Sequence, residues 1–334
     1  GEITFMDGLT FKTQAGLDIA NVRDYMYWDT ESGDGYGYGG LIEEVNSTYA
    51  TWNWQNVLNF TRTFNSVHNL TATAVQEYTH SETEYMDGSV YELSDPFFSE
   101  HIISNTFGQK DVGGWKSENG LASYMFRANY NYDSKYYIGA SIRYDGLSKL
   151  PKDTRWGTFW GASAAWRLSR EKFWTEAPVN EWFNDLRLRA SYATIGNSAL
   201  GSDYPYLGTY GAKLVGPMAG IAWNVMGNNN LKWETTETFD IGLDGALFNN
   251  RMTFEIAYWQ KNSKDLVLRV PTPPTMGIPN NYYYDNIGKI KNSGFELTVG
   301  GTIINTKDWN WHSDINFSTV KNTVKELYGG TDII

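Results

Sequence analysis

The sequence predicts an all-β fold: about eleven strands of an antiparallel up-and-down transmembrane β-barrel. Three observations predict this fold. Apolar and polar residues alternate with a period of two, the alternating segments are long, and the connections between them are short and long in turn. We expect the whole chain, residues 1–334, to belong to one barrel domain.

The alternation is clearest in a pair of neighbouring segments. Residues 235–247 alternate apolar and polar side chains, and residues 251–261 do the same. Asn249-Asn250 lies between them and suits a two-residue primed turn, because Asn tolerates positive φ. This hairpin register places Asp244 directly opposite Glu255. Two carboxylates at that spacing repel each other unless an arginine or a water separates them.

Similar segments recur along the chain and are the predicted strands. They lie at 9–20, 50–64, 67–79, 119–132, 135–146, 155–169, 185–196, 233–247, 251–267, 289–303 and 309–321. A tilted strand crosses a bilayer in ~9–11 residues, whereas strands of soluble proteins have about 5–6. Strand length therefore favours a membrane barrel over a soluble β-sandwich.

The connections alternate in length. Long ones lie at 21–49, 80–118, 197–232 and 268–288, a medium one at 147–154, and short ones at 65–66, 133–134, 248–250 and 304–308. The connection at 170–184 lies where the alternation calls for a short turn but is longer, and we expect a helical turn at Ser169–Trp174. Barrels of the bacterial outer membrane have short periplasmic turns and long extracellular loops. The predicted strand 9–20 therefore runs outward and 50–64 runs inward.

The composition agrees with this fold. Aromatic residues make up 16% of the chain although its mean hydropathy, −0.47, is polar. Such a chain suits a barrel with a lipid-facing side, a wet side and two interfacial aromatic girdles, although a carbohydrate-binding sandwich shares these statistics. The predicted girdle residues are Trp52, Trp54, Trp156, Trp160, Trp309, Trp311, Tyr130, Tyr132 and Tyr136. The net charge of −11 argues against nucleic acid as a partner.

Other kinds of chemistry find no support in the sequence. The absence of Cys excludes disulfides and thiolate zinc sites. The four histidines, His68, His80, His101 and His312, lack i,i+4 spacing, so we expect no metal site and no cofactor. Gly35-x-Gly37-x-x-Gly40 matches a dinucleotide-binding fingerprint by letter but lies in a predicted loop. No nucleophile–base pair is recognisable, so we do not expect an enzyme.

Two sets of candidate functional residues follow from the strand ladder. The polar face of the strands is a predicted lumen wall of Arg127, Arg143, Asp145, Arg167, Arg187, Arg189, Asp240, Asp244, Glu255, Glu296 and Asp314. We favour a hydrated, salt-bridged wall that holds the barrel's shape, and the alternative is a docking surface for a plug or a solute. Aromatic residues of the long loops can stack on sugars or contact peptides, or simply pack the loops. These substrate-binding candidates are Trp115, Tyr204, Tyr206, Tyr210, Trp223, Tyr282, Tyr283 and Tyr284.

A series of short motifs also runs through residues 114–300. They are Gly114-Trp115, Gly120–Tyr124, Tyr136–Ile138, Ser141–Gly146, Arg155–Gly157, Ala165–Phe173, Leu186–Tyr192, Gly196-Asn197, Asn230–Glu234, Ile241–Asp244, Asp265-Leu266, Asn286–Lys289 and Asn292–Leu297. In this order and spacing they resemble the SusC/RagA family of TonB-dependent transporters. Residues 1–113 match the family's style without a distinctive motif.

The resemblance implies import of a nutrient, such as a glycan or an oligopeptide, across the outer membrane of a Gram-negative bacterium of the Bacteroidota. It also implies a plug moved by the TonB complex, a SusD-like surface lipoprotein as partner, contact with outer-membrane lipid, and a dimer of transporter–lipoprotein pairs. Family members carry a signal peptide, a TonB box and a plug, which we expect to lie outside this chain. The family's closing strand has a terminal aromatic, whereas this chain stops at Asp332-Ile333-Ile334, so we expect further strands. The resemblance therefore implies that this chain is a fragment of a larger barrel with about 22 strands.

Two other functions stay open at this point. One is a passive porin or adhesive barrel without energy coupling, which a missing plug domain would favour. The other is a soluble β-sandwich binding module, which extraction without detergent would favour. The sequence does not identify the substrate.

Overall fold

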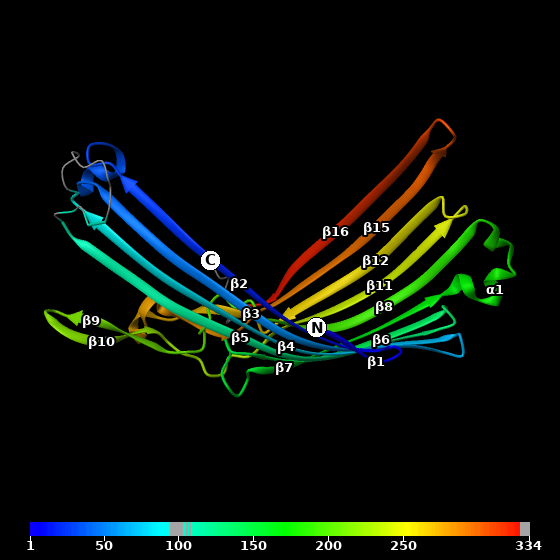
Figure 1. The fold of residues 1–334 in the computed structure, drawn as a ribbon, viewed down its shortest axis with the longest axis horizontal. Helices are drawn as coiled ribbons and strands as arrows, with labels where there is room; N and C mark the ends of the chain where they lie inside the picture. The colour runs from blue at the N-terminus through cyan, green and yellow to red at the C-terminus, as the bar shows by residue number, and fades with distance from the viewer. Residues whose placement is uncertain (94–102, 105, 107, 328–334) are drawn as a thin grey trace. The chain divides into compact units, whose positions relative to one another are not determined.

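The computed structural model describes residues 1–93, 103–104, 106 and 108–327. Within them, twelve strands form one antiparallel sheet in which each strand pairs with its neighbours in chain order (Figure 1). These strands are β1 (Glu2–Met6), β2 (Leu9–Trp28), β3 (Leu41–Phe64), β4 (His68–Tyr91), β5 (Lys110–Tyr132), β6 (Tyr136–Leu147), β7 (Trp156–Arg167), β8 (Phe183–Asn197), β11 (Glu234–Leu247), β12 (Met252–Lys264), β15 (Lys289–Asn305) and β16 (Asn310–Glu326). The predicted up-and-down ladder is confirmed. His101 and the last residues, 328–334, lie outside the described part.

The structure corrects the prediction at the N-terminal strands. It adds β1, which pairs with β2 through a turn at Gly8. Strands β3 and β4 have 24 residues each, so most of the predicted loops 21–49 and 80–118 is strand. Alternation underestimated their length for a physical reason. Where a strand has polar residues on both faces, as at 81–87 and 110–118, the contrast between apolar and polar sides disappears while the backbone ladder continues.

The chain divides into two compact units. The first unit comprises Gly1–Thr13, Asn56–Gln76 and Ala122–Ile334, and the second comprises Gln14–Gln55 and Glu77–Leu121. The second unit therefore holds the later part of β2 and β4 and the earlier part of β3 and β5. It also contains a short 3₁₀ helix, η1 (Gly33–Tyr38).

The tight turns of the first unit have the backbone that their residues favour. Asn249 and Asn250 have φ of 59° and 63°, and the Arg251 amide donates to the Phe248 carbonyl at 3.2 Å. This confirms the predicted primed turn, whose twist matches that of the flanking strands. Asn65-Ser66 and Asp133-Ser134 also have positive φ and close equivalent turns.

The connection between β7 and β8 contains helical turns, as predicted. These are η2 (Leu168–Arg170), α1 (Lys172–Thr175) and η3 (Pro178–Glu181). Glu171 ties them to the sheet, because its carboxylate accepts hydrogen bonds from the Tyr136 hydroxyl and from Trp166 Nε1 at 3.0 Å. These hydrogen bonds lower the pKa of Glu171 below its ordinary value. None of the helices that the structure describes has the length and apolarity to cross a membrane.

Two of the predicted loops contain a hairpin of their own. The loop after β8 holds β9 (Thr209–Val215) and β10 (Met218–Val225), and the loop after β12 holds β13 (Val267–Pro271) and β14 (Tyr282–Asn286). The latter hairpin is joined by η4 (Pro274–Met276) and η5 (Pro279–Asn281). Their strands were missed because they have only 5 to 8 residues.

Buried side chains gather where these loops meet the sheet. Leu147, Leu150 and Leu231 are exposed by 2% or less. Nearby, Trp233 packs edge-on against Phe159 at 5.3 Å, and its Nε1 donates to the Arg155 carbonyl at 2.8 Å. The small apolar core therefore anchors the loops, and many apolar side chains of the sheet stay exposed in this chain.

Aromatic clusters mark both ends of β6. Tyr136 stacks between Tyr132 and Trp166 near its start, and Tyr144 stacks on Trp156 at 4.7 Å near its end. Tyr144 lies eight positions after Tyr136, or roughly 27 Å along the strand at about 3.4 Å per residue. An outer-membrane barrel has an apolar band of about 25 Å between its aromatic girdles. Of the residues predicted at strand ends, Trp52 and Trp54 lie inside β3, because that strand starts at Leu41.

Candidate functional site

Among the described residues, Arg189 of β8 is the centre of a charged cluster with three carboxylates. The hairpin register is as predicted, with Asp244 of β11 opposite Glu255 of β12. Arg189 lies between them and donates to Asp244 Oδ1 at 3.2 Å, to Glu255 Oε1 at 2.5 Å, and to Asp240. The predicted carboxylate pair is therefore bridged by an arginine, which removes the repulsion.

A glycine makes room for this bridge. Gly242 of β11 has Arg189 as its register partner on one side and Ala257 of β12 on the other. A Cβ at position 242 would lie 2.7 Å from Arg189 Cζ. The guanidinium therefore crosses β11 at a position without a side chain and reaches Glu255 on the next strand.

Further ion pairs extend the cluster along the same face. Arg187 donates to Asp244 Oδ2 from both Nε and Nη2, at 2.9 and 2.7 Å. Arg167, the register partner of Arg187, holds both oxygens of Asp185 at 2.7 and 2.9 Å. Together with Thr253 and Thr298 these side chains line a hollow of about 480 Å³. The face is therefore polar and close to charge balance.

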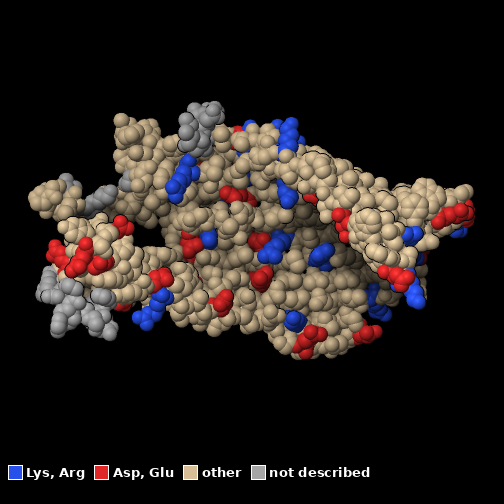
Figure 2. Space-filling model, turned by 90° about the horizontal axis from the view of Figure 1, so that it is seen from above, with Lys and Arg blue, Asp and Glu red and all other residues tan. Residues whose placement is uncertain are grey.

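The other predicted wall residues have simpler surroundings. Arg143 pairs with Asp145 at 2.7 Å and donates to Ser123 at 2.9 Å. Asp314 lies 3.2 Å from His312 Nε2. Glu296 is the register partner of Ala257 and so lies on the face of Glu255. Arg127 makes no ion pair with any part of the chain that the structure describes. Figure 2 shows acidic and basic side chains interspersed among uncharged residues.

Most of the predicted loop aromatics lie on the two loop hairpins. Tyr210 of β9 and Trp223 of β10 are register partners with ring centroids 6.0 Å apart. On the other hairpin, Tyr282 and Tyr284 of β14 flank Arg269 of β13, whose guanidinium lies 4.6 and 5.9 Å from their ring centroids.

Backbone contacts join the two hairpins. Tyr283 forms a parallel bridge with Met226, and Asn228 Nδ2 donates to the Tyr284 carbonyl at 2.9 Å. Tyr206 accepts a hydrogen bond from the Asn228 amide at 3.0 Å, and Tyr204 lies in the same segment before β9. The structure thus brings the aromatics of the predicted loops 197–232 and 268–288 into one neighbourhood.

Trp115 is not a loop residue as the sequence had suggested. It lies within β5 of the second unit, where it stacks on Tyr85 of β4 with ring centroids 5.7 Å apart and an interplanar angle of 15°. The loop assignment was wrong because β4 and β5 continue far beyond their alternating parts. The indole is 54% exposed, so one of its faces is available for a contact.

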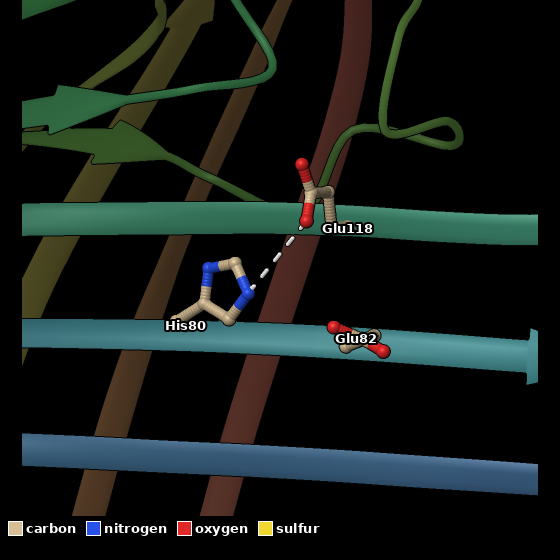
Figure 3. Close-up of side chains that lie close together, drawn as sticks. All are labelled: His80, Glu82 and Glu118. Carbon is tan, nitrogen blue, oxygen red and sulfur yellow. Dashed lines mark ion pairs between the residues drawn. The ribbon is translucent and has the colours of Figure 1, made fainter.

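A cluster of titratable groups in the second unit was missed. His80 and Glu82 of β4 and Glu118 of β5 have ligand-type atoms within 4.8 Å of one another (Figure 3). Searching for i,i+4 spacing could not find it, because two residues follow i,i+2 strand spacing and the third lies on the neighbouring strand. Lys116 lies 2.6 Å from Glu82 and already supplies a positive charge. The cluster is therefore an ion-pair group, and we assign no metal to it.

The glycine motif at 35–40 has no nucleotide-binding structure. Gly35 and Gly37 lie in η1, and Gly40 has φ of +87° directly before β3. A dinucleotide site requires a strand that ends at the motif and a longer helix that begins there. This motif lies in a 3₁₀ turn between two antiparallel strands, as its loop assignment had implied.

Comparison with known proteins decides the family. Residues 2–333 match the family described as TonB dependent receptor-like, beta-barrel. The chain belongs to this family. It is 31% identical over 323 residues to TonB-dependent receptor P39 of Formosa agariphila, and the aligned region covers 96% of this chain and 30% of that protein. It is also 32% identical over 230 residues to TonB-dependent receptor SusC of Bacteroides thetaiotaomicron, covering 67% and 22% of the two chains.

Solved structures agree with this assignment. The structure of the RagAB peptide transporter matches 99% of this chain and 36% of its own chain, with a TM-score of 0.88 and 28% identity. The ferric citrate transporter FecA shares the fold at 10% identity and a TM-score of 0.58. The resemblance to the SusC/RagA family is confirmed, and the chain is part of an outer-membrane β-barrel. It spans 30% of the length of P39 and 36% of the matched chain of the RagAB transporter.

Proposed function

We propose that the complete protein imports a nutrient, a glycan or an oligopeptide, across the outer membrane by TonB-dependent transport. The observation that carries the proposal is the match of nearly the whole chain to RagAB, a peptide transporter, at a TM-score of 0.88. A SusD-like lipoprotein would then be the partner at the outer mouth, with the TonB complex as the energy source. Transporter–lipoprotein pairs would associate as dimers.

Each candidate set has a role in this proposal. The Arg189 cluster holds β8, β11 and β12 together through side chains where the lumen wall is wet. The joined hairpins β9–β10 and β13–β14 present Tyr204, Tyr206, Tyr210, Trp223, Tyr282, Tyr283 and Tyr284 to the solute or the partner. Aromatic side chains give large contact area at low conformational cost, which suits both ligands and protein interfaces.

The test is uptake by a deletion strain complemented with the full-length gene. The informative variant lacks residues 209–225. A Cβ on Gly208 would lie 3.2 Å from the Gly227 amide, so the ends of the deletion are adjacent and can be joined directly. The Tyr206–Asn228 hydrogen bond lies outside the deletion. We expect a barrel that assembles in the outer membrane but has lost growth on the transported nutrient.

The energy requirement separates import from passive diffusion. Uptake through the intact protein should stop when the proton gradient is dissipated or the TonB complex is deleted. Uptake that persists under both treatments would identify a porin and contradict the proposal. Assembly is checked by heat-modifiable migration on a gel, so that loss of function is not confused with loss of folding.

A further inference from the structure

The two units differ sharply in charge. The second unit has sixteen Asp and Glu residues and three Lys and Arg residues, which give a formal charge of −13. The first unit has the remaining 22 acidic and 24 basic residues, which give +2. The net charge of the whole chain, −11, therefore comes entirely from the second unit. A charge of one sign on one part of a surface attracts solutes of the opposite sign.

Side-chain contacts show which residues share a face within the second unit. Thr51 of β3 is hydrogen-bonded to Ser81 of β4 at 3.0 Å. Four residues after Ser81, Tyr85 stacks on Trp115 of β5. A Cβ on Gly113 would lie 2.4 Å from Asp87 Oδ1, so the Asp87 carboxylate lies on this face as well. We call it the Trp115 face.

Period-two alternation assigns further carboxylates to the Trp115 face. Glu43 belongs to the series of Thr51 on β3, and Asp111 to the series of Trp115 on β5. On β2, a Cβ on Gly16 would lie 2.7 Å from Asn53, which has the same parity as Thr51 on β3. Gly16 therefore lies on the Trp115 face, and Asp24 has the same parity as Gly16. The full set is Asp18, Asp24, Glu43, Glu77, Asp87 and Asp111.

The basic residues of the second unit lie on the other face. Lys116 pairs with Glu82, and Lys110 belongs to its series on β5. Arg23 belongs to the series of Asn21, which accepts a hydrogen bond from Thr48. Among the described strands of this unit, the Trp115 face therefore has carboxylates and no Lys or Arg. Along β5, Trp115 has the same alternation parity as Arg127 of the predicted lumen wall.

We propose that the Trp115 face binds the cationic side chains of the transported solute, which is an oligopeptide carrying Lys or Arg. This inference rests on the proposed import function and specifies its substrate. An exposed indole attracts guanidinium and ammonium groups over its ring, and the surrounding carboxylates pair with them. A neutral sugar would stack on Trp115 equally well but would gain nothing from the carboxylates. An anionic solute would be repelled.

The experiment measures peptide binding to the full-length transporter with its lipoprotein in detergent. The probes are a synthetic peptide with three Lys residues, the same peptide with three Gln residues, and one with three Glu residues. The test variant is D24N/E43Q/D87N. The control is E82Q/E84Q/E118Q, which removes the same charge from the opposite face of the same unit. A second test variant, W115L, removes the ring alone.

We expect the Lys peptide to bind most tightly at low ionic strength. The test variant should weaken its binding by about tenfold or more while the control changes it by less than about twofold. W115L should weaken it by about two- to fivefold. Equal effects of the two triple variants, tightest binding of the Gln or Glu peptide, or displacement of the peptide by Ca²⁺ alone would overturn the inference. Failure of energised uptake with these binding results intact would contradict the proposed function instead.

Discussion

The Arg189 cluster allows a quantitative prediction about stability. Replacing Arg189 by Met keeps an unbranched side chain about as long as the arginine's aliphatic stem but removes the charge that bridges Asp240, Asp244 and Glu255. Arg189 is 27% exposed, and its partners are 24%, 19% and 55% exposed, so each contact is worth about 0.5–1 kcal/mol rather than the value of a buried pair. Three contacts contribute about 2 kcal/mol.

The carboxylates left behind add a repulsive term. Asp244 and Glu255 are direct register partners, and without Arg189 their charges face each other across a partly wet surface. Arg187 still pairs with Asp244, so the added repulsion is under about 1 kcal/mol. We therefore expect R189M to lower the free energy of unfolding by about 2–3 kcal/mol.

The measurement is guanidinium unfolding of the full-length protein in lipid vesicles. R127M is the matched control, because Arg127 is an exposed arginine on the predicted lumen wall that makes no ion pair with the described residues; it should change the free energy by less than about 0.5 kcal/mol. The double variant R189M/E255Q should recover part of the loss, because the remaining repulsion disappears. If R189M and R127M unfold alike, the cluster does not stabilise the wall and the reasoning is refuted.

Three further predictions concern the same sheet. G242V should displace the Arg189 guanidinium and lower the free energy of unfolding by about as much as R189M does. In the same unfolding assay, G242V should lower the free energy much less when it is added to R189M. Additive losses would contradict a shared mechanism. N249A/N250A should destabilise the β11–β12 turn by about 2 kcal/mol, because both residues have positive φ. N249G/N250G should be close to the native protein in stability. Equal losses in the two variants would exclude backbone strain as the cause. Because hydrogen bonds lower the pKa of Glu171, the stability that its carboxylate contributes is present above the ordinary carboxyl pKa and is lost as the pH falls through the lowered value. The stability of E171Q should therefore depend less on pH in the acid range. An unchanged acid profile would count against this anchor.

The sequence by itself determined the ladder of the first unit. Around Asn249-Asn250 the alternation, the turn residues and the pairing of Asp244 with Glu255 were all readable, because a membrane strand has one lipid-facing and one wet side. The same reasoning failed for the distant parts of β3, β4 and β5. There polar residues occupy positions of both parities, so the pattern gives no period although the backbone still forms a ladder.

The tertiary structure alone decided which side chains meet. No spacing along the chain reveals that Arg189 crosses Gly242 to reach Glu255, since the three residues lie on three strands. Trp115 was recognised as a candidate but assigned to a loop, and only the pairing of β4 with β5 placed it on Tyr85. Local periodicity is written into neighbouring residues. Contacts between strands depend on register and on the room that each side chain leaves for another, and these exist only in the folded sheet.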